Sequence, residues 1–259
     1  MFPQAATVAK RRNVMPNYMK TRRLTIYLTL LLAACGQKNN TIDEGLISNR
    51  LLVLEDRTKN FSISKTTIEN FKRAKRTSKD EFIQDTINVR KINGVTEVPL
   101  KKPHYPHSLI FKDTPAGIEE TEEKEFNYLG QFPIIGKYLV SGTFWEHYEC
   151  YLIDKKTGSK TTIWNKPRLS TTSKYFANLS IEYGLEGEPN GIQIWKIKKT
   201  NKNNLHKYLE LNQEIWVPDD FVWESDNSII IKVSSVENYM KENGQPKEKD
   251  FFYLKLLLR

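Results

Sequence analysis

Few residues of this 259-residue sequence have types and spacings that could support chemistry. His104 and His107 form an H-x-x-H pair, which on a helix could direct both imidazoles to one metal ion. Pro103 and Pro106 prevent a regular helix, because proline lacks a backbone N–H and clashes with the preceding turn. No cysteine or carboxylate cluster is adjacent, so the sequence predicts a loop near the surface and no metal site.

Cys150 could in principle be a nucleophile. His147 lies three residues away, and an odd spacing on a β-strand places two side chains on opposite faces. No arrangement of histidine and asparagine is visible around Cys150. We therefore interpret it as a buried thiol that packs as a small hydrophobe.

Four carboxylates lie on or beside expected strands: Asp219, Asp220, Glu224 and Asp226. A glycosidase needs two carboxylates about 5–9 Å apart across a cleft, and sequence does not supply that distance. The chain lacks G-x-S-x-G, P-loop, G-x-G-x-x-G and H-E-x-x-H motifs. We expect no catalytic residue and no cofactor, and an unfamiliar hydrolase stays open as an alternative.

The five tryptophans all lie on or beside expected strands. Most are expected in the core, because large aromatic side chains bury much apolar area. Trp145 and Trp216 lie next to strand ends. They are therefore our candidates for an exposed aromatic platform that binds sugar or peptide.

An uncharged run of 11 residues, Leu24 to Ala34, stops at Cys35. As a helix it would reach roughly 16 Å, about half of the ~30 Å hydrocarbon core of a bilayer. It is too short to span a membrane, but it fits the apolar region of a signal peptide. Lys20, Arg22 and Arg23 supply the basic region ahead of it.

Leu32-Ala33-Ala34-Cys35 resembles the lipobox of bacterial lipoproteins. The resemblance implies cleavage between Ala34 and Cys35, a diacylglycerol on the Cys35 sulfur and acylation, such as palmitate, of its new amino group. Two or more acyl chains hold a protein stably on a membrane. Gly36 replaces the Asp that retains some lipoproteins at the inner membrane, which favours the outer membrane. The true start could be Met1 or Met19.

The formal charge of +9 is concentrated in the expected signal peptide. Six Lys and Arg residues and no acid lie in residues 1–34, so the mature chain carries about +3. A nucleic-acid-binding protein would need a concentrated basic face, and we expect no nucleic-acid partner. Residues 35–45 are polar and are interpreted as a lipidated tether.

The rest of the chain is predicted to be mostly β, with antiparallel sheets that are propeller-like or form a meander or sandwich. Residues 46–125 are expected to form a small α+β segment, with strands near 48–57 and 61–63 and a helix that begins with a Thr66–Glu69 capping box and packs through Ile68, Phe71 and Ala74. Residues 126–259 are expected to form a β-rich domain, because short segments rich in Tyr, Trp, Phe, Ile and Val alternate with turns. The expected strands are 137–144, 147–154, 160–164, 174–183, 191–197, 207–211, 214–218, 220–223, 228–235 and 250–258.

The β-rich part contains a weak internal echo. Residues 151–181 and 192–233 share an order of strand, turn, strand, proline, polar turn and strand. This order resembles bacterial β-propeller blades, although the turn at 170–174 lacks their Pro, Asp and Gly. Two or three such units can be traced.

These observations predict a signal-cleaved, lipid-anchored envelope protein that binds a protein or glycan partner or has a structural role, without catalysis. The first alternative is a hydrolase acting on an envelope or extracellular polymer. The second is an immunity or inhibitor lipoprotein that neutralises a toxin.

Overall fold

The computed structural model describes residues 60–85, 87–101, 107–115, 117, 119, 123–145, 147–181, 188–198 and 205–259. The expectations for the signal peptide, Cys35, the tether, the strand near 48–57 and His104 lie outside these residues. Residues Asp43–Arg259 form one compact unit. No helix within the described residues combines the length and the apolar composition that crossing a bilayer requires.

The described residues form four antiparallel sheets, and all but one strand, β1, join the strands that are their neighbours in the chain. We number the sheets I to IV. Sheet I contains β2 (Lys91–Ile92), β3 (Val95–Pro99) and β4 (Ser108–Lys112). Sheet II contains β5 (Lys124–Phe132), β6 (Lys137–Phe144), β7 (Tyr148–Asp154) and β8 (Lys160–Ile163). Sheet III contains β9 (Arg168–Leu169), β10 (Tyr175–Ile181), β11 (Asn190–Ile197) and β12 (Leu205–Asn212).

Sheet IV contains β13 (Trp216–Ser225), β14 (Ser228–Ser235) and β15 (Phe251–Leu258), and β1 (Phe61–Thr66) completes it beside β15. The helices are α2 (Ile68–Thr77) and α3 (Val236–Lys241), and two short 3-10 turns cover Pro133–Ile135 and Glu248–Asp250. The predicted mostly β fold of antiparallel sheets is therefore confirmed.

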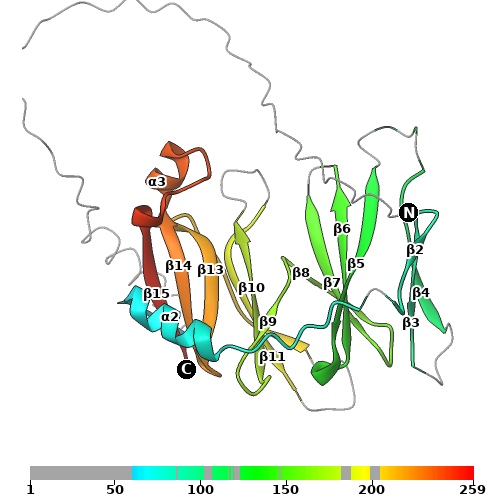
Figure 1. Ribbon diagram of the computed structural model, residues 1–259, viewed down its shortest axis with the longest axis horizontal. Coiled ribbons are helices and arrows are strands. Elements are labelled where there is room, and N and C mark those ends of the chain that lie inside the picture. The colour runs from blue at the N-terminus through cyan, green and yellow to red at the C-terminus, as the bar shows by residue number, and fades with distance from the viewer. Residues whose placement is uncertain are drawn as a thin grey trace, which may run out of the picture. The chain divides into compact units, whose positions relative to one another are not determined.

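The four sheets stack face to face in chain order, with sheets I and IV at the two ends of the row (Figure 1). One apolar cluster joins each neighbouring pair: Val98 and Phe111 of sheet I pack with Ile153 of sheet II. A second cluster joins sheets II and III, and the largest joins sheets III and IV. Helix α2 packs through Phe71 and Ala74 on the outer face of sheet IV.

Strand β11 explains why the sheets stack. Ile192 and Ile194 belong to the cluster shared with sheet IV, whereas Trp195 and Ile197 pack in the cluster shared with sheet II. Successive side chains of a strand point to opposite faces. A strand with apolar residues at both its odd and its even positions therefore needs a packing partner on each face. The sequence alone already predicts a strand covered on both faces, because Ile192 and Ile194 alternate with Trp195 and Ile197, and the structure confirms this.

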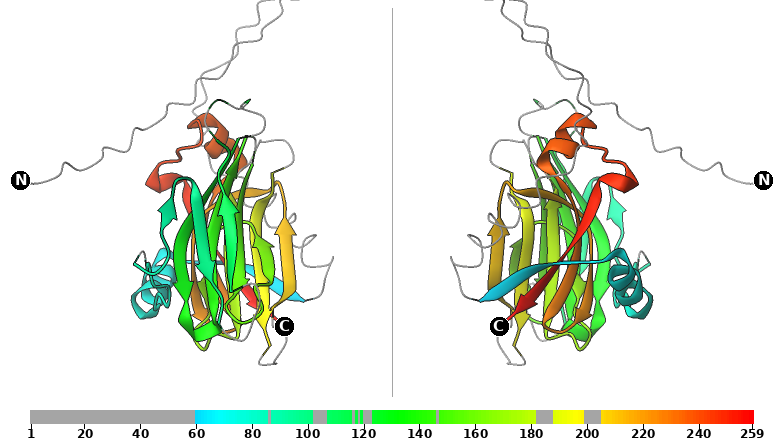
Figure 2. Two further views of the ribbon diagram at one scale, coloured as in Figure 1. Left: turned by 90° about the vertical axis from the view of Figure 1, so that its right-hand side faces the viewer. Right: turned by 90° about the vertical axis from the view of Figure 1, so that its left-hand side faces the viewer.

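The N-terminal segment differs from its prediction. We expected residues 46–125 to be separate from the β-rich domain, but β1 pairs with β15 over its whole length and α2 packs on the same sheet (Figure 2). The helix cap is also shifted by one residue. The Oγ1 of Thr67, not Thr66, accepts a hydrogen bond from the backbone N–H of Asn70, which satisfies a donor that the first helical turn leaves free.

Tight turns join β7 to β8 and β13 to β14, and the first of them depends on an aspartate. The Asp154 carboxylate accepts hydrogen bonds from the backbone N–H groups of Lys156 and Thr157 at 2.9 and 2.8 Å, and Gly158 follows with φ of +71°. This fixes the β7–β8 hairpin, because glycine adopts the left-handed region without a Cβ clash. The turn at residues 226–227 joins β13 to β14.

Two strands expected at 214–218 and 220–223 are one strand, β13. Its register with β14 shifts between Pro218 and Asp220, as in a β-bulge. Proline cannot donate to the ladder, so the sequence suggested a break where the structure has only a local irregularity.

We expect Phe61→Ala to destabilise the protein by about 3–5 kcal/mol, because Phe61 is fully buried in the cluster between sheets III and IV. Equilibrium unfolding in guanidinium chloride measures this loss. Ile87→Ala serves as the control, because Ile87 is 76% exposed and its truncation should change stability by less than about 0.5 kcal/mol. Equal effects of the two substitutions would contradict the placement of β1 in the core.

Candidate functional site

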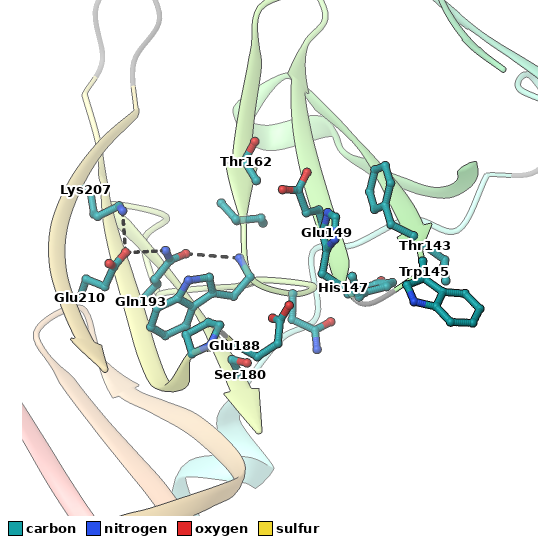
Figure 3. Close-up of a pocket in the computed structure, with 16 residues that line it drawn as sticks. Thr143, Trp145, His147, Glu149, Thr162, Ser180, Glu188, Gln193, Lys207 and Glu210 are labelled. Atoms are coloured by element: carbon teal, nitrogen blue, oxygen red, sulfur yellow. Dashed lines mark hydrogen bonds and ion pairs between the residues drawn. The ribbon is translucent and has the colours of Figure 1, made fainter. Parts of the chain in front are cut away.

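A groove of about 640 Å³ opens between sheets II and III (Figure 3). One wall comes from sheet II and consists of the ends of β6, β7 and β8, together with Trp145 after β6 and Trp164 after β8. The other wall comes from β10, β11 and β12 of sheet III. The side chains from sheet II include Thr143, Phe144, Trp145, His147, Tyr148, Glu149, Thr162 and Trp164. Those from sheet III include Ser180, Glu188, Gln193, Lys207 and Glu210.

Aromatic side chains dominate the sheet II wall. Trp145 follows the last residue of β6 and is 49% exposed, and Tyr148 begins β7 and is 39% exposed. The ring of His147 stacks on Phe144 at 4.4 Å between centroids with an interplanar angle of 5°. The connection between β6 and β7 thus presents large flat rings to solvent at the mouth of the groove.

A hydrogen-bonded chain crosses the groove from one sheet to the other (Figure 3). The buried Gln193 accepts a hydrogen bond at Oε1 from the backbone N–H of Trp164, at 3.4 Å, and from Trp195 Nε1, at 3.3 Å. Its Nε2 donates to Glu210 at 2.7 Å. Because both ends of the amide are engaged, Gln193 holds the two walls in a fixed relation.

Glu210 is held as an ionised acceptor. Partial burial alone would raise its pKa, but hydrogen bonds from Lys207, at 2.5 Å, and from Gln193 outweigh burial and lower the pKa below its ordinary value. A carboxylate with a lowered pKa accepts hydrogen bonds near neutral pH and is a poor proton donor. Glu149 and Glu188 also line the groove, so its walls carry three glutamates and one lysine.

Trp216 is not an exposed aromatic, contrary to the sequence prediction. Its side chain is fully buried in the cluster between sheets III and IV. Asn190 and Gln213 each donate a side-chain hydrogen bond to the Trp216 carbonyl at 2.8 Å, which ties the start of β13 to sheet III. The neighbouring sheet therefore covers a strand end that looked free in the sequence. Trp145, the other candidate, lines the groove.

The four carboxylates that the sequence offered as candidates for catalysis all contact cationic or polar side chains. Asp220 forms ion pairs with Lys75 of α2 at 2.8 Å and Arg168 of β9 at 2.6 Å. Burial would raise the pKa of Asp220, but these two cations outweigh burial and lower it. The other three carboxylates have partners as well. Lys232 pairs with Asp219, and Lys255 pairs with Glu224. Ser170, Thr172 and Lys174 contact Asp226. None of the four lines the groove between sheets II and III.

Cys150 is a buried thiol. Its side chain is fully buried between sheets II and III, and its Sγ donates to the Tyr148 hydroxyl at 3.3 Å. Burial raises the pKa of Cys150 to about 11, against a smaller lowering by the hydrogen bond with Tyr148. His107 is exposed, and no cluster of three or more His, Cys, Asp or Glu that could hold a metal occurs among the described residues.

The sequence analysis missed Gln193, Lys207 and Glu210. The alternation of β11 assigned Gln193 to the same face as Trp195, and this signal could have singled it out as a polar residue among apolar neighbours. Glu210 and Lys207 lie on β12, which pairs with β11. Their relation to sheet II depends on stacking that no local pattern encodes.

Comparisons of this chain with protein-family models, with curated proteins and with solved structures found no match. The residues that line the groove are therefore the basis for a functional proposal.

We expect the native thiol of Cys150 to resist modification. A pKa of about 11 leaves a thiolate fraction at pH 8 more than ~100-fold below that of an ordinary thiol, and burial blocks the reagent. Ellman's reagent should label a Cys35→Ser variant slowly in buffer and at once in guanidinium chloride. Rapid labelling of the folded protein would identify an accessible nucleophile instead.

Proposed function

We propose that this protein is a carbohydrate-binding module and that the groove between sheets II and III is its binding site. The observation that carries the proposal is the pair of exposed rings, Trp145 and Tyr148, at the mouth of a groove with polar walls. A ligand that packs on these exposed rings would bury a large apolar area, which is strongly favourable.

The chemistry of the walls fits a sugar ring better than an apolar ligand. One face of a pyranose presents C–H groups that pack on an aromatic ring, while its rim presents hydroxyls that both donate and accept hydrogen bonds. Glu210 and Glu149 offer acceptors, Lys207 offers donors, and the side chains of Thr143 and Thr162 can do both. Ligand sites commonly combine an aromatic surface with a few placed polar groups.

Binding without cleavage is favoured over hydrolysis. A glycosidase needs a carboxylic acid that is protonated near neutral pH, which requires a raised pKa. Glu210 has the opposite environment, since Lys207 and Gln193 stabilise its charge. Glu149 already accepts a hydrogen bond from the Tyr151 hydroxyl. We propose that these carboxylates orient the ligand.

We further propose that the protein is held at the cell envelope by lipid on Cys35, most naturally at the outer membrane. The support is the sequence Leu32-Ala33-Ala34-Cys35 together with the basic residues and the short apolar run before it. The polar residues 35–45, which we expect to form a tether, would let the groove reach polymer near the membrane.

Truncation of Trp145 to alanine should weaken oligosaccharide binding about tenfold or more, because it removes the largest exposed ring of the groove. A glycan array followed by calorimetry on the tightest oligosaccharide measures the change. Ile134→Ala removes a 60% exposed apolar side chain outside the groove and should leave affinity unchanged. Release of shorter sugars by the wild-type protein would favour the hydrolase alternative.

Cys35→Ala should abolish labelling with radioactive palmitate and shift the protein from the membrane fraction to the soluble fraction of its host. The matched control is Cys150→Ala, which removes the other cysteine and should change neither result. A Cys35→Ala protein that is still labelled and still membrane-bound would refute the lipid anchor.

A further inference from the structure

A second cavity, of about 290 Å³, lies between sheet I and sheet II. The rings of Phe111, Phe126 and Tyr151 form its floor. Phe111 and Phe126 are in contact, with their centroids 5.3 Å apart. We call it the lysine cavity, because Lys112, Lys124 and Lys160 surround these rings.

The three lysines of this cavity have exposed side chains, and their charge is not balanced by an ion pair within the part of the chain that the structure describes. Lys91, on the same sheet I, behaves differently, since it pairs with Asp113 at 2.7 Å and with Glu125 at 3.4 Å. Asp113, next to Lys112, and Glu125, next to Lys124, are therefore already engaged by Lys91.

Lys160 is held over the aromatic floor. Its Nζ lies 5.8 Å from the centroid of Phe111 and 5.7 Å from that of Tyr151, within the range of cation–π attraction. An ammonium group fixed over two rings is oriented before a ligand arrives. It can meet an anion without first losing much side-chain freedom.

Phe144 connects the lysine cavity to the groove. Its ring lines both cavities, and it contacts Phe126 edge to face at 5.9 Å on one side and stacks on His147 on the other. The two cavities differ in charge, because the groove has three glutamates and one lysine whereas the lysine cavity has three lysines. Glu149 of the groove also accepts a hydrogen bond from the Tyr151 hydroxyl of the lysine cavity, so the two linings meet at this pair as well as at Phe144.

We propose that the polysaccharide bound by this protein alternates neutral and anionic sugars, with a neutral sugar in the groove and a carboxylate-bearing sugar in the lysine cavity. The inference rests on the proposed function of the groove. A continuous polyanion is disfavoured by the glutamates of the groove, and a neutral polymer leaves the lysines without a partner. A polysaccharide in which neutral and anionic sugars alternate is complementary to the charges of both cavities at once.

The test compares three oligosaccharides of equal length by calorimetry on the full chain: a hyaluronan hexasaccharide, its carboxyl-reduced counterpart and a polygalacturonate hexamer. We expect hyaluronan to bind about tenfold more tightly than the reduced form, since three exposed ammonium groups each contribute modestly. It should also bind more tightly than polygalacturonate. Its advantage should shrink between 50 and 500 mM NaCl, because salt screens exposed charges.

A triple variant with Lys112→Gln, Lys124→Gln and Lys160→Gln should lose the preference for hyaluronan and keep its affinity for the reduced form. A triple variant with Lys156→Gln, Lys241→Gln and Lys249→Gln removes the same charge from exposed lysines outside both cavities and should keep the preference. Equal binding of hyaluronan and its reduced form would overturn the inference, as would an unchanged preference in the first variant. Equal capture of DNA or anionic lipid vesicles would do the same.

These outcomes are separable from a failure of the proposed function. Trp145→Ala acts in the groove and should weaken both the acidic and the reduced hexasaccharide, whereas the lysine variant should weaken only the acidic one. Binding that depends on Trp145 but not on charge would leave the groove as a carbohydrate site and remove the lysine cavity from it. Binding that is indifferent to Trp145 would overturn the proposed function itself.

Discussion

Burial of both faces of the middle sheets is the constraint on which the structure depends. Sheets II and III have apolar side chains on both of their faces, so neither face of either sheet can be left exposed to solvent. Each needs a neighbour on each side, and the stack ends only where something else covers the last sheet. At sheet IV that cover is α2, which buries Phe71 and Ala74.

This constraint also explains the role of β1. β1 extends sheet IV beyond β15 and becomes its edge strand. β1 adds six paired residues beside β15, and Phe61 and Ile63 enter the cluster between sheets III and IV. The first described strand thereby ties the beginning of the folded unit to its end.

The groove and the lysine cavity are consequences of the same stacking. Twisted sheets that pack in their centres diverge towards their ends, and the groove opens where β6, β7 and β8 terminate against sheet III. Within the packed centre, polar groups must be paired, as Gln193 is. At the diverging ends, rings such as Trp145 meet solvent, which is why aromatic and charged side chains gather there.

Local pattern was sufficient for much of the fold. The strand limits expected for β6 and β14 agree with the structure, because their β-branched and aromatic residues are bounded by clear turn residues. The internal echo also corresponds to a repeated unit, the last two strands of one sheet followed by the first two of the next. The short β9 and the whole of β5 were missed, since two residues or a Glu-rich start give little strand signal.

By itself the sequence determined the mostly β composition and the two-sided burial of β11, because these depend on the periodicity of neighbouring residues. Tertiary structure alone decided that β1 joins β15, that Trp216 is covered while Trp145 is open, and that Gln193 meets Glu210 beside Trp164. These contacts join strands of different sheets or distant parts of the chain. Local sequence periodicity does not determine which sheet stacks on which face, and this stacking forms the groove between sheets II and III.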